Sequence, residues 1–200
     1  MNRISTTQSA GKKLKRLFTR IAAACRGNPS LKDAVPVFGA GVAPCDLMII
    51  GEAPGREETR DALPFVGKAG KFLIAALKEV FGKDRDEFYI TNVVKVWPRI
   101  ETKRLKTRKP LKAEEEFFVP YLEKEIEIVR PRVILAVGKT AFSALAPDKE
   151  FKPGVWCDYG GGILLMPVYH PSYLLRKQKK LLENTKELKA ALREVKKMIS

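Results

Sequence analysis

Four short apolar runs, each bounded by turn-forming residues, predict the strands of a buried sheet. They cover residues 46–50, 88–94, 133–137 and 163–169. Runs of this length fit strands and are too short for helices of ordinary length. We therefore predict a core of four strands.

Helical segments separate these strands along the chain. They cover about residues 1–20, 68–81, 114–129 and 179–198, and Gly138 opens one further short helix. Because strands alternate with helices, we predict an α/β fold, a three-layer α/β/α sandwich around a mainly parallel sheet. Residues 97–112 are basic and show no periodicity, so we expect a loop there.

Both ends of the chain are amphipathic. The apolar positions that we expect to face inward are Leu14, Leu17, Phe18 and Ile21 near the start, and Leu182, Leu188, Leu192 and Val195 near the end. We expect one domain over residues 1–200, with a basic helical extension at 1–24 and a C-terminal helix at 179–200. The sequence leaves open whether the basic extension packs on the domain or reaches a partner.

Composition narrows the class of function. The 200 residues are 45% hydrophobic, which excludes general disorder. Lys and Arg number 38 against 23 Asp and Glu, a net charge of +15. A positive surplus of this size favours a polyanionic partner, most often nucleic acid, over a surface that is merely well solvated.

The chain lacks the features of a secreted or membrane protein. No apolar run approaches the roughly 20 residues of a membrane span. The basic start has no apolar signal-peptide core, and the three Cys are widely spaced, which fits a reducing compartment. We expect a monomer that acts in the cytoplasm, associated with the nucleoid and not with a membrane.

Polar residues follow three of the predicted strands. Glu52 and Glu58 follow the first, the second carries Asn92 near its end and is followed by Lys95, and His170 follows the fourth. In parallel sheets ligands bind beyond the carboxyl ends of the strands, so these side chains are expected at one rim. Each has a plainer interpretation as a turn, a cap or a structural group, but together they suit proton transfer, base recognition or hydrolysis.

A metal site is not expected at this rim. His170 is the only His in the chain, and the Cys are too scattered to match the spacing of metal ligands.

Three motifs in order resemble those of family 4 uracil-DNA glycosylases. This chain resembles the first motif at residues 51–55, Gly-Glu-Ala-Pro-Gly, and at residues 64–70, Pro-Phe-Val-Gly-Lys-Ala-Gly. The second resembles Thr-Asn-Val-Val-Lys at 91–95, and the last resembles His-Pro-Ser-Tyr-Leu-Leu-Arg at 170–176. The resemblance implies an enzyme that flips uracil out of DNA, hydrolyses its N-glycosidic bond and leaves an abasic site.

The resemblance also implies roles for pocket residues. Phe65 would stack on the flipped base, the Asn92 amide would pair with uracil O4 and N3–H, and Gly51 and Ala53 would complete the binding site. His170 would donate a hydrogen bond to the developing oxyanion at O2. Glu52 and Glu58 are alternative candidates for the carboxylate that stabilises the sugar cation and orients a water.

Further residues are expected to contact DNA. They are Lys68, Lys95, Arg99, Lys103, Arg104, Ser172, Leu174, Leu175 and Arg176. Leu174 and Leu175 would fill the gap left by the flipped base, or else would pack a short helix on the core. The basic stretch at 97–110 would contact phosphates, or else would simply be solvated.

The sequence departs from the family where the family holds an iron–sulfur cluster. Members of family 4 typically use four Cys for a [4Fe–4S] cluster. Here Asn28, Val96 and Phe118 stand at three of those positions, and only Cys25 matches. We therefore expect no cluster, with apolar side chains filling its space.

Two other functions fit the same residues. One is a DNA-binding module for damaged or single-stranded DNA that has lost the chemistry. The other is a glycosylase for a different deaminated base, such as hypoxanthine or xanthine.

Overall fold

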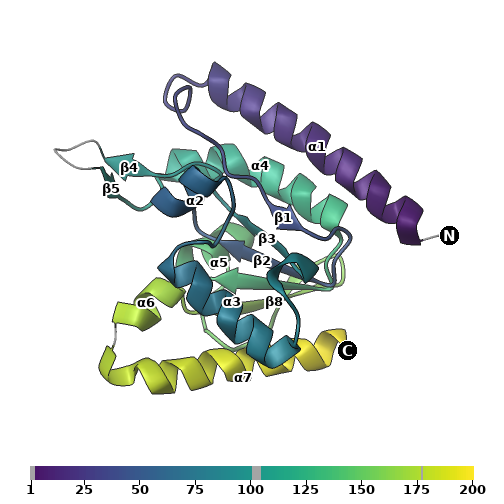
Figure 1. Ribbon diagram of the computed structural model, residues 1–200, viewed down its shortest axis with the longest axis vertical. Helices are drawn as coiled ribbons and strands as arrows, with labels where there is room; N and C mark the ends of the chain where they lie inside the picture. The colour runs from purple at the N-terminus through teal and green to yellow at the C-terminus, as the bar shows by residue number, and fades with distance from the viewer. Residues whose placement is uncertain (1–2, 101–104, 177) are drawn as a thin grey trace.

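A six-stranded sheet forms the centre of the molecule (Figure 1). The computed structural model describes residues 3–100, 105–176 and 178–200. In spatial order the strands are β1 (Ala40–Gly41), β3 (Tyr89–Asn92), β2 (Leu47–Gly51), β6 (Val133–Val137), β8 (Ile163–Val168) and β7 (Cys157–Gly160). The middle four strands are mutually parallel. They are the strands predicted from the sequence, so the mainly parallel sheet is confirmed.

Two antiparallel edge strands were not predicted. β1 is only two residues long and pairs with β3, and β7 pairs irregularly with β8. Neither has an apolar run, because both lie at the margin of the sheet and are partly exposed. The predicted count of four strands is therefore too low by these two edges.

Helices cover both faces of the sheet, as expected for a three-layer sandwich. α3 (Lys68–Phe81) and α7 (Leu181–Ile199) pack on one face, and α4 (Lys112–Val129) and α5 (Lys139–Leu145) on the other. Shorter helical segments are α2 (Arg56–Asp61), α6 (Pro171–Arg176), η1 (Arg85–Glu87) and η2 (Gln178–Lys180).

Alternation along the strands builds the two halves of the core. In β2, Met48 and Ile50 join the apolar cluster under α4, whereas Leu47 and Ile49 join the cluster under α3 and α7. Successive strand side chains point to opposite faces, so a fully apolar run seals both layers at once.

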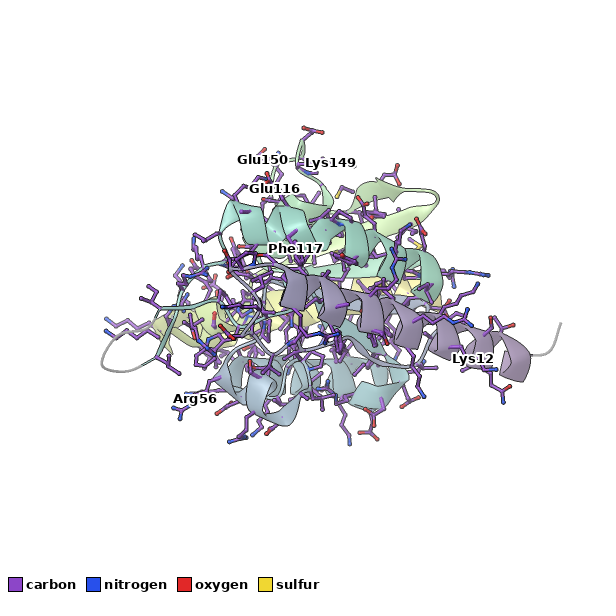
Figure 2. All side chains as sticks on the ribbon, turned by 90° about the horizontal axis from the view of Figure 1, so that it is seen from above. Lys12, Arg56, Glu116, Phe117, Lys149 and Glu150 are labelled. Carbon is purple, nitrogen blue, oxygen red and sulfur yellow. The ribbon has the colours of Figure 1, made fainter. Side chains whose placement is uncertain are left out.

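The N-terminal extension is a long helix, α1 (Arg3–Gly27), which packs on the outer side of α4. Its buried positions include Leu14, Leu17 and Ile21, as the periodicity predicted. Figure 2 looks down on the molecule from above, and α1 lies in front of the rest, with Lys12 on its N-terminal half. The extension therefore packs on the domain through its apolar face.

The prediction that Leu182 faces the core is wrong. Leu182 is exposed, whereas Leu188, Leu192 and Val195 are buried. Leu182 lies in the first turn of α7, whereas the residues of α7 that join the core come from its later turns.

The segment predicted as a loop contains a short hairpin, β4 (Arg99–Ile100) and β5 (Lys106–Thr107). Trp97 Nε1 donates to Thr107 Oγ1 at 2.9 Å, which ties its two sides together. Strands of two residues give no readable period, so the pattern did not reveal them. Lys103 and Arg104, expected at DNA, lie outside the described residues.

No helix in the described part of the chain has the length and apolarity needed to cross a bilayer.

Candidate active site

A cleft of about 690 Å³ opens at the carboxyl ends of β2, β3 and β8. The hairpin forms part of its wall through Thr107. The predicted site residues that line the cleft are Glu52, Ala53, Glu58, Phe65, Lys68, Asn92, His170, Ser172 and Arg176. The fold thus gathers three sequence-distant motifs around one cavity.

Asn92 forms the floor of this cleft. It ends β3, is only 3% exposed, and its side-chain amide makes no hydrogen bond with any described residue. Gly51 ends the neighbouring β2, and a Cβ there would collide with Asn92 Oδ1 and the Phe65 ring. Glycine at 51 therefore allows the amide and the ring to approach each other, and the amide remains available to a ligand.

A buried ion pair holds the main chain of Asn92. Lys95 Nζ donates to the Asn92 carbonyl at 2.6 Å and to Glu125 Oε2 at 2.5 Å. Tyr89 donates its hydroxyl to Glu125 Oε1 at 2.7 Å. Burial lowers the pKa of the Lys95 ammonium, and the Glu125 carboxylate acts in the opposite direction.

The expectation that Lys95 contacts DNA is therefore wrong. Its side chain is 0% exposed, and its charge is matched by Glu125 inside the protein. Glu125 was not predicted from the sequence. Its signal was an acidic residue at a position of α4 between the buried Leu122 and Ile126.

Glu58 is saturated by backbone donors. Oε2 accepts from the Gly55 N–H at 3.0 Å, and Oε1 accepts from the N–H groups of Val66 at 3.0 Å and Gly67 at 2.7 Å. The carboxylate thus fastens the turn after β2 to the loop that precedes α3. A carboxylate committed to three donors is poorly placed to take a proton from a water.

Phe65 lies in that loop with a left-handed backbone, at φ +57°. This conformation costs a non-glycine residue roughly 1–2 kcal/mol, so its surroundings must enforce it. Arg85 Nη2 donates to the Pro64 carbonyl at 2.7 Å, and Nη1 lies 3.5 Å from the Phe65 carbonyl oxygen. Gly70 lies so close that a Cβ there would collide with the Phe65 backbone. Sequence reasoning missed Arg85, since a charged residue in a turn gives no local signal.

His170 follows β8 and presents a defined tautomer. The Ser172 N–H lies 3.2 Å from Nδ1, and the Ser172 hydroxyl oxygen lies 2.8 Å from it. A backbone N–H can only donate, so Nδ1 accepts, and the proton of the neutral ring is on Nε2. Burial lowers the pKa of His170, against a smaller raising effect of Glu52. The ring is therefore a neutral donor through Nε2.

Glu52 is the unengaged carboxylate of the cleft. The residue is half-buried, and its carboxylate forms no hydrogen bond or ion pair with a described residue. It lines the cleft together with His170, and its charge acts to raise the pKa of the imidazole. Of the two candidate acids, Glu52 is thus the one free to hold a water.

The segment after His170 gives a mixed result. Leu174 is 1% exposed and packs in the cluster that contains Leu188 and Leu192. The expectation that it inserts into DNA is therefore wrong, and the alternative of core packing holds. Leu175 is half-buried outside the cleft lining, whereas Arg176 is exposed at the cleft.

Arg99 lies outside the cleft lining, on β4. Its guanidinium carbon is 5.9 Å from the centre of the Trp97 ring.

The residues at the expected cluster positions do not suit an iron–sulfur cluster. Cys25, Val96 and Phe118 all lie in the same buried apolar cluster, with exposed fractions of 2% or less. Burial raises the pKa of the Cys25 thiol and so disfavours the thiolate that iron requires. A [4Fe–4S] cluster needs four thiolates, and Cys45 and Cys157 lie on other elements.

Comparisons with known proteins agree with this geometry. The sequence pattern of the family described as "Uracil DNA glycosylase superfamily" matches residues 38–196. The type-4 uracil-DNA glycosylase of Saccharolobus solfataricus is 36% identical over 174 residues, which cover 80% of this chain and 77% of that protein. Those of Thermotoga maritima and Pyrobaculum aerophilum are 38% and 37% identical, over 70% and 73% of this chain and 71% and 75% of the relatives. The chain belongs to the uracil DNA glycosylase superfamily.

Proposed function

We propose that this protein removes uracil from DNA by hydrolysing the N-glycosidic bond. The observation that carries the proposal is the meeting of Phe65, Asn92 and His170 with a free Glu52 in one cleft. Relatives at 36–38% identity that are named type-4 uracil-DNA glycosylases support the same activity.

The depth of the Asn92 amide requires the base to leave the duplex. Asn92 is 3% exposed at the floor of the cleft. A base stacked in a helix cannot reach such a group, so the nucleotide must rotate out of the stack into the cleft. Phe65 then supplies an aromatic face for the uracil ring.

Base selection follows from the chemistry of an amide. The Asn92 side chain both donates and accepts, which matches the O4 acceptor and the N3–H donor of uracil. Cytosine presents the reverse pattern at these two atoms. In the amide orientation that pairs with uracil, cytosine would leave a buried donor and acceptor unsatisfied, at a cost of about 1–3 kcal/mol for each group.

Bond cleavage sends the electron pair of the C1′–N1 bond into the uracil ring. His170 donates through Nε2–H to the negative charge that grows on O2. Glu52 stabilises the cationic sugar and orients a water, whose oxygen bonds to C1′ as one of its protons passes to the Glu52 carboxylate. The uracil anion takes up one proton in turn, so that the charges balance. The products are free uracil and an abasic site.

Two further parts of the proposal concern the assembly. The apolar packing of Val96 and Phe118 around Cys25 supports activity without an iron–sulfur cluster. The proposal also includes action as a monomer on DNA.

Single-turnover cleavage of a labelled oligonucleotide with one uracil tests the proposal. We expect uracil release by wild-type protein and no release from the same strand carrying thymine or cytosine. Release of hypoxanthine or xanthine with uracil left intact would instead assign a different deaminated base. DNA binding with no release of any base would assign a binding module.

A further inference from the structure

The positive charge of the molecule is concentrated on α1. This helix carries seven Lys and Arg and no acidic residue, so it holds +7 of the net charge of +15. α7 is also basic, but its five Lys and Arg are accompanied by three Glu. Lys189 pairs with Glu79 at 2.6 Å, and Lys197 with Glu194 at 2.7 Å. The two helices therefore differ in how much of their charge is neutralised within the protein.

The described cations of α1 are exposed and form no ion pair with a described residue. Those whose side chains the structure describes are Lys12, Lys13, Lys15, Arg16, Arg20 and Arg26. All are exposed, and none forms an ion pair with another described residue. Unpaired charges of one sign along a helix repel one another, so an arrangement of this kind is stabilised by a polyanion that binds there.

The geometry of α1 gives these cations a common direction. Lys12, Arg16 and Arg20 recur every four residues and so lie along one line of the helix, opposite the buried Leu14 and Ile21. From Lys12 to Arg26 this face is about 21 Å long at 1.5 Å per residue. That length equals about six base pairs of DNA at 3.4 Å each.

The C-terminal end of α1 also extends toward the substrate side of the molecule, whereas Lys12 lies toward the opposite end of the helix (Figure 2). The end of α1 at Gly27 lies on the same side as the β4–β5 hairpin and α2, which border the cleft (Figure 1). The helix precedes residues 38–196, the segment that matches the family. Its charge is therefore a feature of this chain outside the matched region.

We propose that the exposed face of α1 is a second DNA-binding surface, which holds the phosphate backbone of the DNA flanking the uracil. The proposal rests on the proposed function, since that function brings DNA to the neighbouring cleft. Lys12, Arg16 and Arg20 contact phosphates and read no sequence. They add affinity and leave the chemical step unchanged.

The test compares two triple variants that each remove three positive charges. One is Lys12→Gln, Arg16→Gln and Arg20→Gln on α1. The control is Arg193→Gln, Lys196→Gln and Lys197→Gln on the last turns of α7, away from the cleft (Figure 1). Dissociation constants are measured against salt on uracil duplexes with flanks of 4 and of 20 base pairs. Single-turnover rates are measured at saturating enzyme.

Each lost phosphate contact lowers the slope of log K against log salt by about 0.9. We expect the α1 variant to lose up to about 2.7 from the slope and at least about 10-fold in affinity on the long duplex. On the short duplex it should equal wild type, and its saturated rate should be unchanged. Equal losses in both variants, or a loss that does not depend on flank length, would overturn the proposal.

These binding data are separate from the proposed function. If wild-type protein bound DNA through α1 but released no uracil, the second surface would stand and the glycosylase proposal would fail. If the α1 variant bound like wild type while uracil release persisted, only the second surface would fail.

A different observation carries a second inference, about Arg85. Its guanidinium holds the Pro64 and Phe65 carbonyls, while Glu58 holds the Val66 and Gly67 N–H groups. The Arg85 cation and the Glu58 anion thus hold consecutive peptide groups around Phe65, whose backbone is left-handed. We infer that Arg85 is a positioning residue that keeps the Phe65 ring in place for the flipped uracil. This inference also rests on the proposed function.

A double-mutant cycle tests whether Arg85 acts through Phe65. We expect Arg85→Met to slow single-turnover uracil release about 10-fold in wild type and to have no further effect in Phe65→Ala protein. The control is Arg132→Met, which removes a comparable arginine bond to the Met198 carbonyl, 2.8 Å long and remote from the cleft. A full loss from Arg85→Met in the Phe65→Ala background, or an equal loss in the control, would refute the inference. If wild type released no uracil at all, the proposed function would fail instead.

Discussion

The residues of the cleft divide into those that face a ligand and those that hold them in place. Asn92, Glu52 and His170 keep polar atoms available at the cavity. Lys95, Glu58 and Arg85 instead form hydrogen bonds with backbone groups. The sequence predicts the first group well, because strand ends and motif order place those residues together. The sequence did not distinguish the second group, because the residue type is the same whether a charged side chain faces solvent or binds a backbone group.

The side chain of Asn92 offers a direct test of base selection. Asn92→Asp replaces the amide donor by an acceptor, which then faces an acceptor atom of uracil. We expect single-turnover uracil release to fall by at least about 10²-fold, the effect of losing one buried hydrogen bond and leaving its partner unsatisfied. Unchanged uracil release by this variant would contradict the placement of uracil against Asn92.

The pH dependence of the reaction reports on His170. Burial lowers its pKa, so the ring stays neutral as the pH falls through the ordinary value near 6.5. We expect the single-turnover rate to be level from pH 8 to below 6.5. It should fall only at lower pH, where a proton on Nδ1 would oppose the Ser172 N–H. A rate that rises as the pH falls through 6 would indicate a charged donor instead.

Ser172 provides the matched variant. Its hydroxyl stabilises the neutral ring at Nδ1, so Ser172→Ala should raise the pKa of His170 and move the acid limb of the rate profile to higher pH. Ser172→Thr, which keeps the hydroxyl, should leave the limb in place. The same linkage affects stability: the unfolded chain takes up the proton more readily, so the free energy of unfolding falls as the pH drops below about 6.5.

At the scale of elements, the central strands and long helices were predictable and the edges were not. β2 and β6 are apolar on both faces, which marks them clearly in the sequence. The β4–β5 hairpin and β1 have strands of two residues each and depend on tertiary contacts such as Trp97 to Thr107. Leu174 belongs to a pattern that suits both a DNA wedge and a packed helix, and only its burial decides between them.

The buried ion pair between Lys95 and Glu125 predicts that stability and DNA affinity depend on different lysines. Lys95→Met leaves the Glu125 carboxylate buried without a cation, so we expect the free energy of unfolding to fall by about 3–5 kcal/mol. The salt slope of DNA binding should not change. The control, Lys68→Met, alters an exposed cation at the cleft and should lower that slope by about 0.9 at constant stability. The reverse pattern in these two variants would contradict the burial of Lys95.

The packing of α1 against α4 predicts the energetic role of Phe118. It is 0% exposed beside Cys25 and Val96, so Phe118→Ala should lower the free energy of unfolding by about 3–5 kcal/mol. Its half-buried neighbour serves as the control, and Phe117→Ala should cost less. Urea titrations with and without an iron chelator measure both. A wild-type stability that fell with the chelator would contradict an apolar core at this place.

At the scale of the whole molecule, the net charge predicts a polyanionic partner but not the surface that would bind it. Composition gives +15 for the chain, and the structure shows that α1 holds nearly half of it without a single acid. The spacing of the apolar residues predicted the apolar face of α1, and the Lys and Arg between them predicted its basic face. The placement of its C-terminal end on the cleft side depends on the packing of α1 against α4, which no local pattern encodes.

The measurement that tests the central claim most directly is single-turnover uracil release by purified protein, with the visible absorption spectrum recorded on the same sample. We predict uracil release from colourless protein, and loss of that release by at least about 10²-fold in His170→Leu, the scale of one lost oxyanion donor. Release that depends on a brown, iron-containing fraction, or the absence of release from uracil DNA, would contradict a cluster-free uracil glycosylase built on this cleft.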